Sequence, residues 1–340
     1  MNPVRWGVLG TASIATSRFI PAIEDASAAR LVAVASREAS KAKAVAQRFD
    51  VPRCYGTYDE MLRDAEIEAL YIPLPNHLHL EWSVRALEAG KHVLCEKPLC
   101  LTAAEIEMLL AARERSGRHI EEAFAYRNHP QWTRIGELLD SGTIGTVRAV
   151  QCTLAKQFLD PNDIRNNPDK GGGALYDLGS YAISACSAAF GRSPRRVIAA
   201  VDRDPVFKID RLSTAILDYG DGHASFTVGT QSGPSDWATH QQFSVLGSAG
   251  WLRCDFPYAH ARPTPCHVYV GDQRSHGAVE TTTYDFEPVN QYTLQVDRFS
   301  RYVRRDAVAS WPIEDSLLTL RIVEALFASA KDGRWKNIAG

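Results

Sequence analysis

The sequence lacks several features that would assign it to a class of protein at once. It has no apolar run near the roughly 20 residues that a membrane-spanning helix needs. Its 38 basic and 40 acidic residues are interspersed, with a net charge of -2 and no basic stripe or tail. We therefore expect neither nucleic acid nor a membrane as a partner. The N-terminus starts a strand pattern without a charged, apolar leader, so we expect no signal peptide.

The seven cysteines also lack a recognisable pairing pattern. Their number is odd, they are scattered, and no two form a C-x-x-C motif. This argues against a disulfide framework and against a structural zinc site. His77 and His79 are two residues apart and would diverge on a helix, so we expect no metal. We expect a cytoplasmic protein whose thiols are reduced. We expect its ligand to be a small molecule.

What is present suffices for two domains, with 340 residues of which 45% are hydrophobic. In the first third, segments with helical periodicity alternate with short apolar runs, namely "RWGVLG", "RLVAVAS", "EALYIP", "HVLCEK" and "HIEEAF". This rhythm is typical of a parallel sheet whose strands are buried on both faces.

Past about residue 145 the pattern changes to longer β-branched and aromatic segments. The turn "YGDGH" between two of them predicts a hairpin, and the tail "PIEDSLLTLRIVEALFASAKDG" is helical. We therefore predict an α/β chain: a doubly wound Rossmann domain that binds a dinucleotide over residues 1–125, followed by an α+β domain over residues 126–340. The second domain is expected to hold a large, mainly antiparallel open sheet that binds substrate and other subunits.

The end of the first apolar run predicts a phosphate-binding turn. In "GVLGTASIA", Gly10, Ala12 and Ala15 occupy the three positions of a G-x-G-x-x-G/A fingerprint. The middle glycine is missing, which weakens the match. Backbone N–H groups at the start of the following helix would hold the anion; they belong to Thr11, Ala12, Ser13 and Ile14.

The end of the second apolar run indicates which dinucleotide is bound. An NAD-binding domain usually places Asp or Glu here, but this chain has Ser36 and Arg37, with Lys41 one turn further on. These groups suit a 2′-phosphate, which a carboxylate would repel. We predict NADP rather than NAD. The alternative is that Arg37 is a solvated charge, and the nearby Glu38 keeps it open.

Two further segments carry chemistry. "HVLCEKPL" places Glu96 and Lys97 at the carboxyl end of a buried strand, where ligands bind in open α/β sheets. "GGGALYDLGSYAI" puts Asp177 and Tyr181 four residues apart, on one face of a helix that the three glycines would let begin against a close neighbour. Taken alone, both segments also fit ordinary solvated or core-edge residues.

The phosphate turn, "EKP", "EAFAYRNHP" and "GGGALYDLGSYAI" occur in an order and spacing that resemble the Gfo/Idh/MocA oxidoreductases over nearly the whole chain. Tyr181, where many relatives have histidine, resembles the branch of NADP-dependent D-xylose 1-dehydrogenases, dimeric dihydrodiol dehydrogenases and glucose-fructose oxidoreductase. The resemblance implies that Lys97, Tyr181 and Asp177 are catalytic. It also implies further cofactor contacts, namely Leu74, Pro75, Asn76, His79, Glu96, Lys97 and Arg127, and substrate contacts, namely Lys97, Phe158, Arg165, Asp177 and Tyr181. Tyr126 and Trp237 are expected to pack.

A hydride moved to or from a carbon that bears oxygen requires a proton-transferring group and a cation near that oxygen. Lys97 and Tyr181 can fill these roles, and either could transfer the proton. We expect an NADP-dependent dehydrogenase or reductase acting on a sugar or cyclic polyol, with aldose oxidation to a lactone first. A trans-dihydrodiol dehydrogenase, a keto-sugar reductase and a non-catalytic NADP sensor are the alternatives. The resemblance also implies a homodimer or a dimer of dimers.

Overall fold

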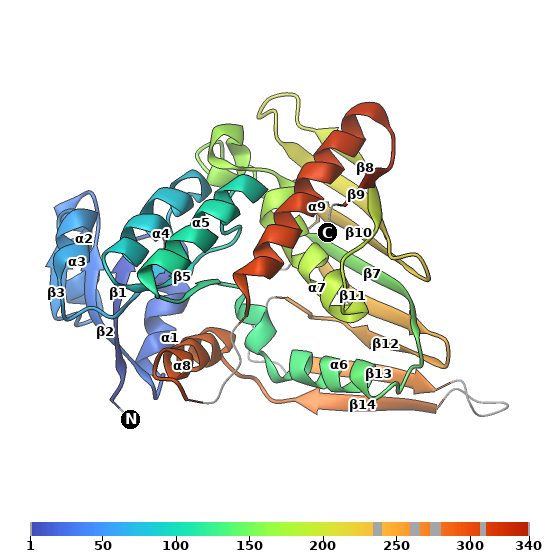
Figure 1. Cartoon of the computed structure of the whole chain (residues 1–340), viewed down its shortest axis with the longest axis horizontal. Helices are drawn as coiled ribbons and strands as arrows, with labels where there is room; N and C mark the ends of the chain where they lie inside the picture. Colours follow the sequence, from blue (N-terminus) through green and yellow to red (C-terminus); the bar gives the residue numbers. More distant parts are fainter. Residues whose placement is uncertain (1, 234–239, 259–265, 273–279, 307–310, 339–340) are drawn as a thin grey trace. The chain divides into compact units, whose positions relative to one another are not determined.

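The computed structural model describes residues 2–233, 240–258, 266–272, 280–306 and 311–338, and the chain forms two compact units (Figure 1). The first unit comprises Met1–Asn128 and Asn290–Leu317, and the second comprises His129–Val289 and Leu318–Gly340. This grouping differs from a single division after residue 125, because a segment near the C-terminus returns to the first unit.

The first unit is built on a parallel sheet of six strands in the order β3-β2-β1-β4-β5-β6, which is the order of a Rossmann fold. Its strands are β1 (Val4–Leu9), β2 (Ala29–Ala35), β3 (Arg53–Tyr55), β4 (Ala69–Ile72), β5 (His92–Cys95) and β6 (Ile120–Glu122). The predicted Rossmann class is confirmed. The sequence pattern missed β3, which has only three residues and no fully buried side chain.

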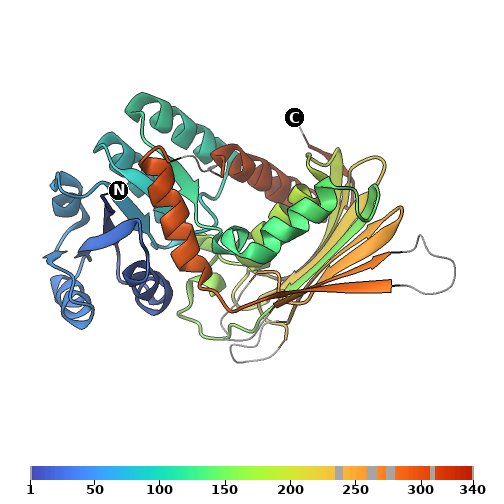
Figure 2. The same ribbon diagram turned by 90° about the horizontal axis from the view of Figure 1, so that it is seen from below.

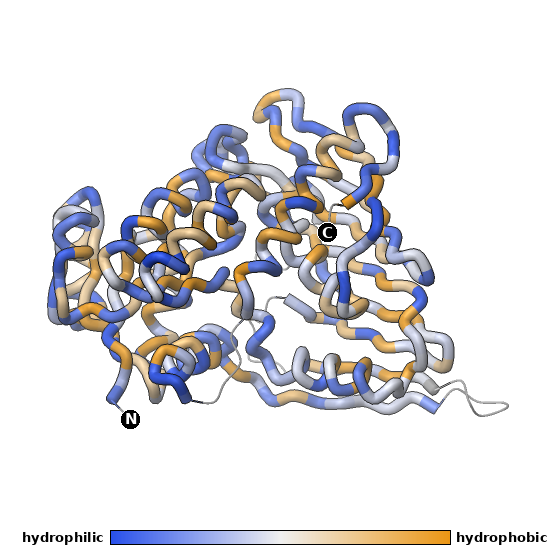
Figure 3. Tube along the Cα trace, viewed as in Figure 1, coloured by the Kyte–Doolittle hydropathy of each residue, from blue (hydrophilic) through white to orange (hydrophobic). Residues whose placement is uncertain are grey.

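Helices cover both faces of this sheet. They are η1 (Ala15–Phe19), α1 (Ile20–Glu24), α2 (Ala39–Arg48), α3 (Tyr58–Arg63), η2 (Asn76–Leu78), α4 (His79–Glu88), α5 (Ala103–Ser116), η3 (Ala125–Asn128) and α8 (Gln291–Val303). Helices α4 and α5 lie side by side, with hydrophobic and hydrophilic segments alternating along them (Figures 1 and 3). A capping box between Thr102 and Glu105 begins α5, and Gly117 ends it with φ of 63°.

Helix α8 completes the core of the first unit although it comes from the far end of the chain. The ring of Phe299 lies 5.0 Å from that of Trp6, and Trp6 Nε1 donates a hydrogen bond of 3.0 Å to Ser300 Oγ. Val296 and Phe299 are fully buried in the same cluster as Trp6. The contacts explain why this helix belongs to the first unit.

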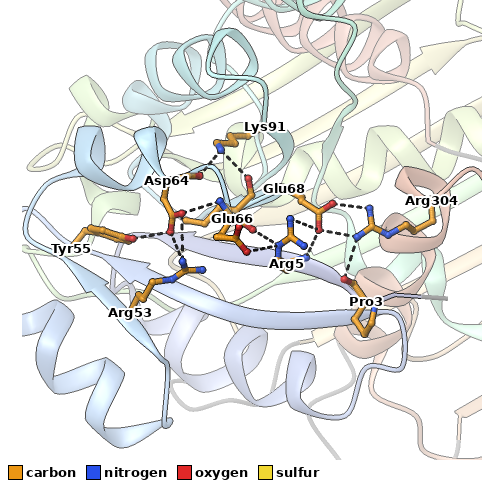
Figure 4. A network of polar contacts seen from close by, with 10 residues as sticks. Pro3, Arg5, Arg53, Tyr55, Asp64, Glu66, Glu68, Lys91 and Arg304 are labelled. Atoms are coloured by element: carbon orange, nitrogen blue, oxygen red, sulfur yellow. Dashed lines mark hydrogen bonds and ion pairs between the residues drawn. The ribbon is translucent and has the colours of Figure 1, made fainter.

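A polar network, drawn in Figure 4, fastens α8 to the sheet. Arg304, just after α8, donates two hydrogen bonds of 2.8 Å to the carboxylate of Glu68 and one of 3.2 Å to the carbonyl of Pro3. Glu68 also accepts a hydrogen bond from the backbone of Arg5 in β1. Paired contacts between guanidinium and carboxylate fix geometry as well as charge. The network therefore sets the register of α8 against β1.

The second unit contains a sheet of nine strands in the order β14-β13-β12-β11-β7-β10-β9-β8-β15. They are β7 (Val147–Ala155), β8 (Arg196–Arg203), β9 (Asp210–Asp218), β10 (His223–Gly229), β11 (His240–Gly247), β12 (Gly250–Cys254), β13 (Cys266–Asp272), β14 (Glu280–Phe286) and β15 (Lys336–Asn337). Every pair is antiparallel except β7 and β10. The predicted large, mainly antiparallel sheet is confirmed, and "YGDGH" is the turn between β9 and β10.

The helices of the second unit lie on one face of its sheet (Figure 2). They are α6 (Pro130–Asp140), η4 (Ile164–Asn166), η5 (Pro168–Lys170), η6 (Leu175–Gly179), α7 (Ser180–Phe190) and the part of α9 (Ile313–Asp332) after Leu317. Helix α7 packs on β7 and β10. Among the described residues, no helix is long and apolar enough to span a membrane.

Candidate active site

The phosphate turn after β1 has the backbone geometry that an anion site needs. Gly10 has φ of 128°, and a Cβ there would lie 3.0 Å from Leu74 Cδ2. The turn therefore requires glycine at this position. Helix η1 follows, and Ile14 before it makes no side-chain cap. The first N–H groups of a helix have no acceptor within the helix, so they suit a phosphate.

The residues after β2 differ in their surroundings. Ser36 is buried, and its Oγ accepts a hydrogen bond of 3.3 Å from the N–H of Glu38. Lys41 Nζ lies 2.7 Å from Glu38 Oε1, with both side chains exposed. Arg37 is exposed and close to Tyr58. Burial raises the pKa of Tyr58, and the charge and hydrogen bond of Arg37 only partly oppose the rise.

Arg37 and the glycine turn share Tyr58 as a neighbour. The hydroxyl of Tyr58 lies 3.9 Å from the position of a Cβ on Gly10. Arg37 is therefore linked to the turn through Tyr58, whereas Lys41 is paired with Glu38. The residues present fit a dinucleotide, with a turn that admits a close anion and an exposed guanidinium linked to it through Tyr58.

The loop after β4 is held by a buried histidine. Pro75 precedes η2, which begins at Asn76. His79 is fully buried, with Nδ1 2.8 Å from the carbonyl oxygen of Pro98 and Nε2 2.7 Å from that of Leu74. Burial lowers the pKa of His79 to about 4. Its described contacts therefore reach the loop through the backbone, whereas the sequence resemblance implies a contact with the cofactor.

The segment after β5 carries Glu96 and Lys97. Tyr71 donates a hydrogen bond of 2.5 Å from its hydroxyl to Glu96 Oε1, and the N–H of Lys97 donates one of 3.3 Å to Oε2. The ring of Tyr71 is buried and stacks on Phe19 at 3.7 Å. The Lys97–Pro98 peptide bond is cis. Glu96 thus holds the backbone of Lys97 at the carboxyl end of β5.

Arg127 is held inside the first unit by a carboxylate and two rings. Its Nη1 donates a hydrogen bond of 3.2 Å to Asp315 Oδ2, and its Cζ lies 5.0 Å from the ring of Phe124 and 5.1 Å from that of Trp311. These contacts account for its position without a cofactor, so its cofactor contact stays a prediction. Tyr126 is buried, as expected for packing. Trp237 lies outside the described residues.

In the second unit, Gly171, Gly172 and Gly173 allow the backbone to approach a neighbouring segment closely just before η6. Gly171 and Gly173 have φ of 74° and 117°. A Cβ on Gly172 would lie 2.5 Å from the carbonyl oxygen of Arg165 and 2.7 Å from that of Asn167. The glycines therefore let η6 begin against the η4–η5 segment, which carries Arg165.

A buried carboxylate caps the start of η6. Asp210 Oδ2 accepts hydrogen bonds of 2.7 Å from the N–H of Leu175 and 3.0 Å from Ser213 Oγ. A negative charge at a helix N-terminus is favourable. Burial nevertheless dominates and raises the pKa of Asp210 to about 6.

The structure brings Phe158, Arg165 and Asp177 together. Arg165 Nε donates a hydrogen bond of 2.9 Å to Asp177 Oδ2, and its Cζ lies 4.4 Å from the ring of Phe158. Tyr181, on α7, is partly exposed, with its ring 5.6 Å from that of Tyr258. The helical stretch that begins at Leu175, where Asp210 caps it, therefore carries both Asp177 and Tyr181.

Sequence reasoning missed Tyr58, Tyr71 and Asp210, which support the predicted residues. Tyr58 and Tyr71 lie far along the chain from the residues they contact, and no local pattern marks them. No metal centre forms in the described part of the chain, where no three His, Cys, Asp or Glu side chains meet suitably.

Comparison with known proteins gives matches over nearly the whole chain. Residues 4–124 match the model of the Gfo/Idh/MocA oxidoreductase family, NAD-binding Rossmann fold, and residues 132–253 match its C-terminal domain. An uncharacterized oxidoreductase, ORF334, of Rhizobium meliloti is 43% identical over 342 residues, which is 99% of this chain and 100% of that protein.

Two further matches come from proteins with stated activities. D-xylose 1-dehydrogenase (NADP(+)) 2 of Haloferax volcanii is 34% identical over 331 residues, covering 96% of this chain and 98% of that one. The crystal structure of KijD10, a 3-ketoreductase from Actinomadura kijaniata in complex with NADP and TDP-benzene, gives a TM-score of 0.87 at 30% identity. That match covers 96% of this chain and 98% of the other.

Proposed function

We propose that this chain, which belongs to the Gfo/Idh/MocA oxidoreductase family, uses NADP to oxidise an aldose at C1 to its lactone. Family membership makes it an oxidoreductase with a Rossmann unit that binds NAD or NADP. The sugar and the choice of NADP are the proposal. The observation that carries this proposal is the position of Lys97 directly after the carboxyl end of β5. The Gly10 turn, which follows β1, lies at the same edge of the sheet.

The preference for NADP rests on the residues after β2. Arg37 is exposed beside Tyr58, and the carboxylate that follows it, Glu38, is paired with Lys41. A 2′-phosphate would meet the guanidinium of Arg37 and the hydroxyl of Ser36. Similarity to D-xylose 1-dehydrogenase (NADP(+)) 2, and to KijD10, whose crystal structure contains NADP, supports the same preference.

We assign the proposed chemistry to Lys97, Tyr181 and Asp177, with Arg165 as the partner of Asp177. Bound NADP supplies the group that accepts or gives the hydride. The ammonium of Lys97 would donate a hydrogen bond to the reacting oxygen and stabilise negative charge on it. Tyr181 or Lys97 would take the hydroxyl proton. Asp177, held by Arg165, would accept hydrogen bonds from the sugar hydroxyls.

Reduction of a keto-sugar is the second candidate, because it uses the same groups in reverse. The similarity to a 3-ketoreductase over 96% of the chain favours it. A trans-dihydrodiol is a third substrate, for which the ring of Phe158 beside Arg165 offers an aromatic surface. A cytoplasmic location is part of the proposal, and it is supported by seven free cysteines.

The test is the absorbance of reduced nicotinamide in the presence of aldoses, inositols and trans-dihydrodiols, with NADP and NAD run in parallel. Turnover of a pentose or hexose with NADP is expected, and Lys97→Met should abolish it while NADPH still binds. Tyr181→Phe then assigns the proton: a loss as large as that of Lys97→Met makes Tyr181 the base.

Two results would contradict the proposal. No turnover of any substrate in the panel, and no reduction of keto-sugars by NADPH, would favour a non-catalytic NADP-binding sensor. Normal turnover by folded Lys97→Met protein would remove Lys97 from the reaction.

A further inference from the structure

The peptide bond between Pro98 and Leu99 is held by buried side chains at both of its polar atoms. On one side, His79 Nδ1 lies 2.8 Å from the carbonyl oxygen of Pro98. On the other side, the N–H of Leu99 donates a hydrogen bond of 3.0 Å to Glu122 Oε1. This peptide bond begins one residue after Lys97. The conformation of the segment that carries Lys97 is therefore fixed by two side chains from outside it.

Glu122 is a buried carboxylate that the proposed reaction does not use. It ends β6 and is 8% exposed. Its other oxygen, Oε2, accepts a hydrogen bond of 2.6 Å from Ser316 Oγ, and Ser316 is itself buried near the start of α9. Both carboxylate oxygens thus have a partner within the first unit. A carboxylate is kept in such a place only when its oxygens are satisfied.

The charge of Glu122 also faces cations. Burial raises the pKa of Glu122, while Ser316, Arg127, the N–H of Leu99 and Lys97 act in the opposite direction. Lys97 is therefore close enough for its ammonium to interact electrostatically with this carboxylate. The same group that holds the backbone of the segment thus also faces the charge that the segment carries.

The opposite side of the clamp reaches the cofactor edge. His79 Nε2 lies 2.7 Å from the carbonyl oxygen of Leu74, whose side chain packs against the Gly10 position. A neutral imidazole has one N–H, so His79 donates a hydrogen bond to one of its two neighbouring carbonyl oxygens and lies against the other, between the loops after β4 and β5. The loop after β5 is joined to β6 and α9 through Glu122. A shift of the Pro98–Leu99 peptide would therefore change the contacts of both His79 and Glu122.

We propose that Glu122 is a positioning residue for Lys97: by accepting the hydrogen bond of Leu99 N–H opposite His79, it fixes the backbone from which Lys97 reaches the substrate oxygen. This inference rests on the proposed function for the role of Lys97. Without the acceptor, Leu99 would keep a buried, unpaired N–H, which is unfavourable enough to make the segment move. Hydride transfer is sensitive to small displacements of the groups around it.

The experiment compares Glu122→Gln with Glu122→Leu in the full-length protein. The amide oxygen of Gln keeps an acceptor for Leu99, whereas Leu has similar bulk and none. Glu114→Leu, an exposed glutamate on α5, is the matched control. The first readout is hydrogen exchange of the Leu99 amide by mass spectrometry, which needs no substrate. The others are kcat, the Kd for NADPH, and the deuterium isotope effect with a C1-deuterated sugar.

We expect slow exchange at Leu99 in the wild type, Glu122→Gln and Glu114→Leu, and fast exchange in Glu122→Leu. We expect kcat to fall about thirtyfold in Glu122→Leu and about threefold or less in Glu122→Gln, with the Kd for NADPH unchanged. The isotope effect should rise in Glu122→Leu because hydride transfer becomes slower than the other steps. Ser316→Ala, which removes the second partner, should speed exchange and lower kcat by about threefold. Ser316→Ala replaces Glu122→Leu as the test of the clamp if Glu122→Leu does not fold.

Three results would overturn the inference. Exchange at Leu99 that stays slow in Glu122→Leu and in Ser316→Ala would show that Glu122 does not hold the peptide. A Kd for NADPH that weakens in step with kcat would make Glu122 a cofactor contact instead. An equal loss in Glu122→Gln and Glu122→Leu would make its charge, and not its hydrogen bond, the cause. If the wild type turns over no sugar, the proposed function fails, while hydrogen exchange still decides whether the clamp exists.

Discussion

Arg165 and Asp177 form a hydrogen-bonded ion pair, with Arg165 Nε donating to Asp177 Oδ2 at 2.9 Å. Arg165 Nη1 also donates to Asp163 Oδ1 at 3.3 Å. Burial lowers the pKa of Arg165, but the two carboxylates outweigh it and leave the pKa raised. Arg165 therefore keeps its charge, and Asp177 always faces a cation.

Replacing Arg165 by Met should leave Asp177 buried without its charged partner. We expect kcat/KM for the sugar to fall about a hundredfold, and the free energy of unfolding to fall by about 1–3 kcal/mol, because Arg165 is only partly buried. Steady-state kinetics and urea unfolding measure both. Arg211→Met, which breaks an exposed pair with Asp202, should change neither. Unchanged kinetics in Arg165→Met would separate the pair from substrate binding.

Gly172→Ala should damage the second unit. The new Cβ would lie 2.5 Å from the carbonyl oxygen of Arg165, and backbone atoms cannot swing aside as a side chain can. We expect a loss of stability of at least about 2 kcal/mol and loss of sugar turnover. Gly136→Ala on α6, where a Cβ meets nothing within 4 Å, should be neutral or stabilising. Thermal melts of the two variants decide the matter, and equal melting temperatures would contradict the expected clash.

Asp210 predicts how stability changes with pH. Its pKa is raised to about 6, above the unfolded value of about 3.9, so the folded state binds its proton more tightly. The contribution to stability is full below pH 4 and is lost as pH rises through 6. The change is about 3 kcal/mol. Asp210→Asn keeps an acceptor for Leu175 and does not titrate. The difference in melting temperature between wild type and variant should therefore grow in favour of the variant between pH 4 and 7. A constant difference would mean that Asp210 titrates normally.

Arg37→Ala should weaken the binding of NADPH while leaving that of NADH nearly unchanged. A lost contact between guanidinium and phosphate is expected to raise the Kd for NADPH about thirtyfold. Lys41→Ala should have a smaller effect, because Lys41 is paired with Glu38. Fluorescence titration of both nucleotides measures the four values. An equal loss for NADPH and NADH would refute the assignment of Arg37 to the 2′-phosphate.

The outer face of the nine-stranded sheet is the expected subunit interface. Ile216 on β9 is 42% exposed and Leu246 on β11 is 50% exposed, and each alternates with buried residues along its strand. We expect light scattering to report a dimer or a dimer of dimers at micromolar concentration. Ile216→Glu with Leu246→Glu should shift it toward the monomer, whereas Val206→Glu, in an exposed loop, should not. A wild-type monomer would contradict the proposal.

Most of the fold could be predicted because its signal is local. Strands β1, β2, β4 and β5 are mostly buried apolar residues, and these runs alternate with helical segments. β3 escaped because its three residues are not fully buried. The place of α8 could not be predicted either, because its packing on Trp6 joins residues nearly 300 positions apart. The hydrogen bond that Trp6 Nε1 donates to Ser300 Oγ spans the same separation.

The candidate site could be predicted where a motif carries it. Gly10, Gly171 and Gly173 have the positive φ angles that their glycine pattern implies, whereas the hydrogen bond between Arg165 and Asp177 was not predicted. The supporting residues were out of reach. Nothing in "HIEEAF" says that Glu122 accepts a hydrogen bond from Leu99, and nothing near Asp210 says that it caps η6. Such contacts depend on how separate loops meet.

The return of Asn290–Leu317 to the first unit imposes an order in time. The ribosome synthesises Val296 and Phe299 only after β7 to β14 of the second sheet. Until then Trp6 lacks the cover that α8 provides. For the same reason the cofactor-binding half cannot be cut from the gene as one stretch. A fragment of residues 1–128 would present the ring of Trp6 to water, whereas a chain that joins it by a linker to residues 290–317 would carry its own cover.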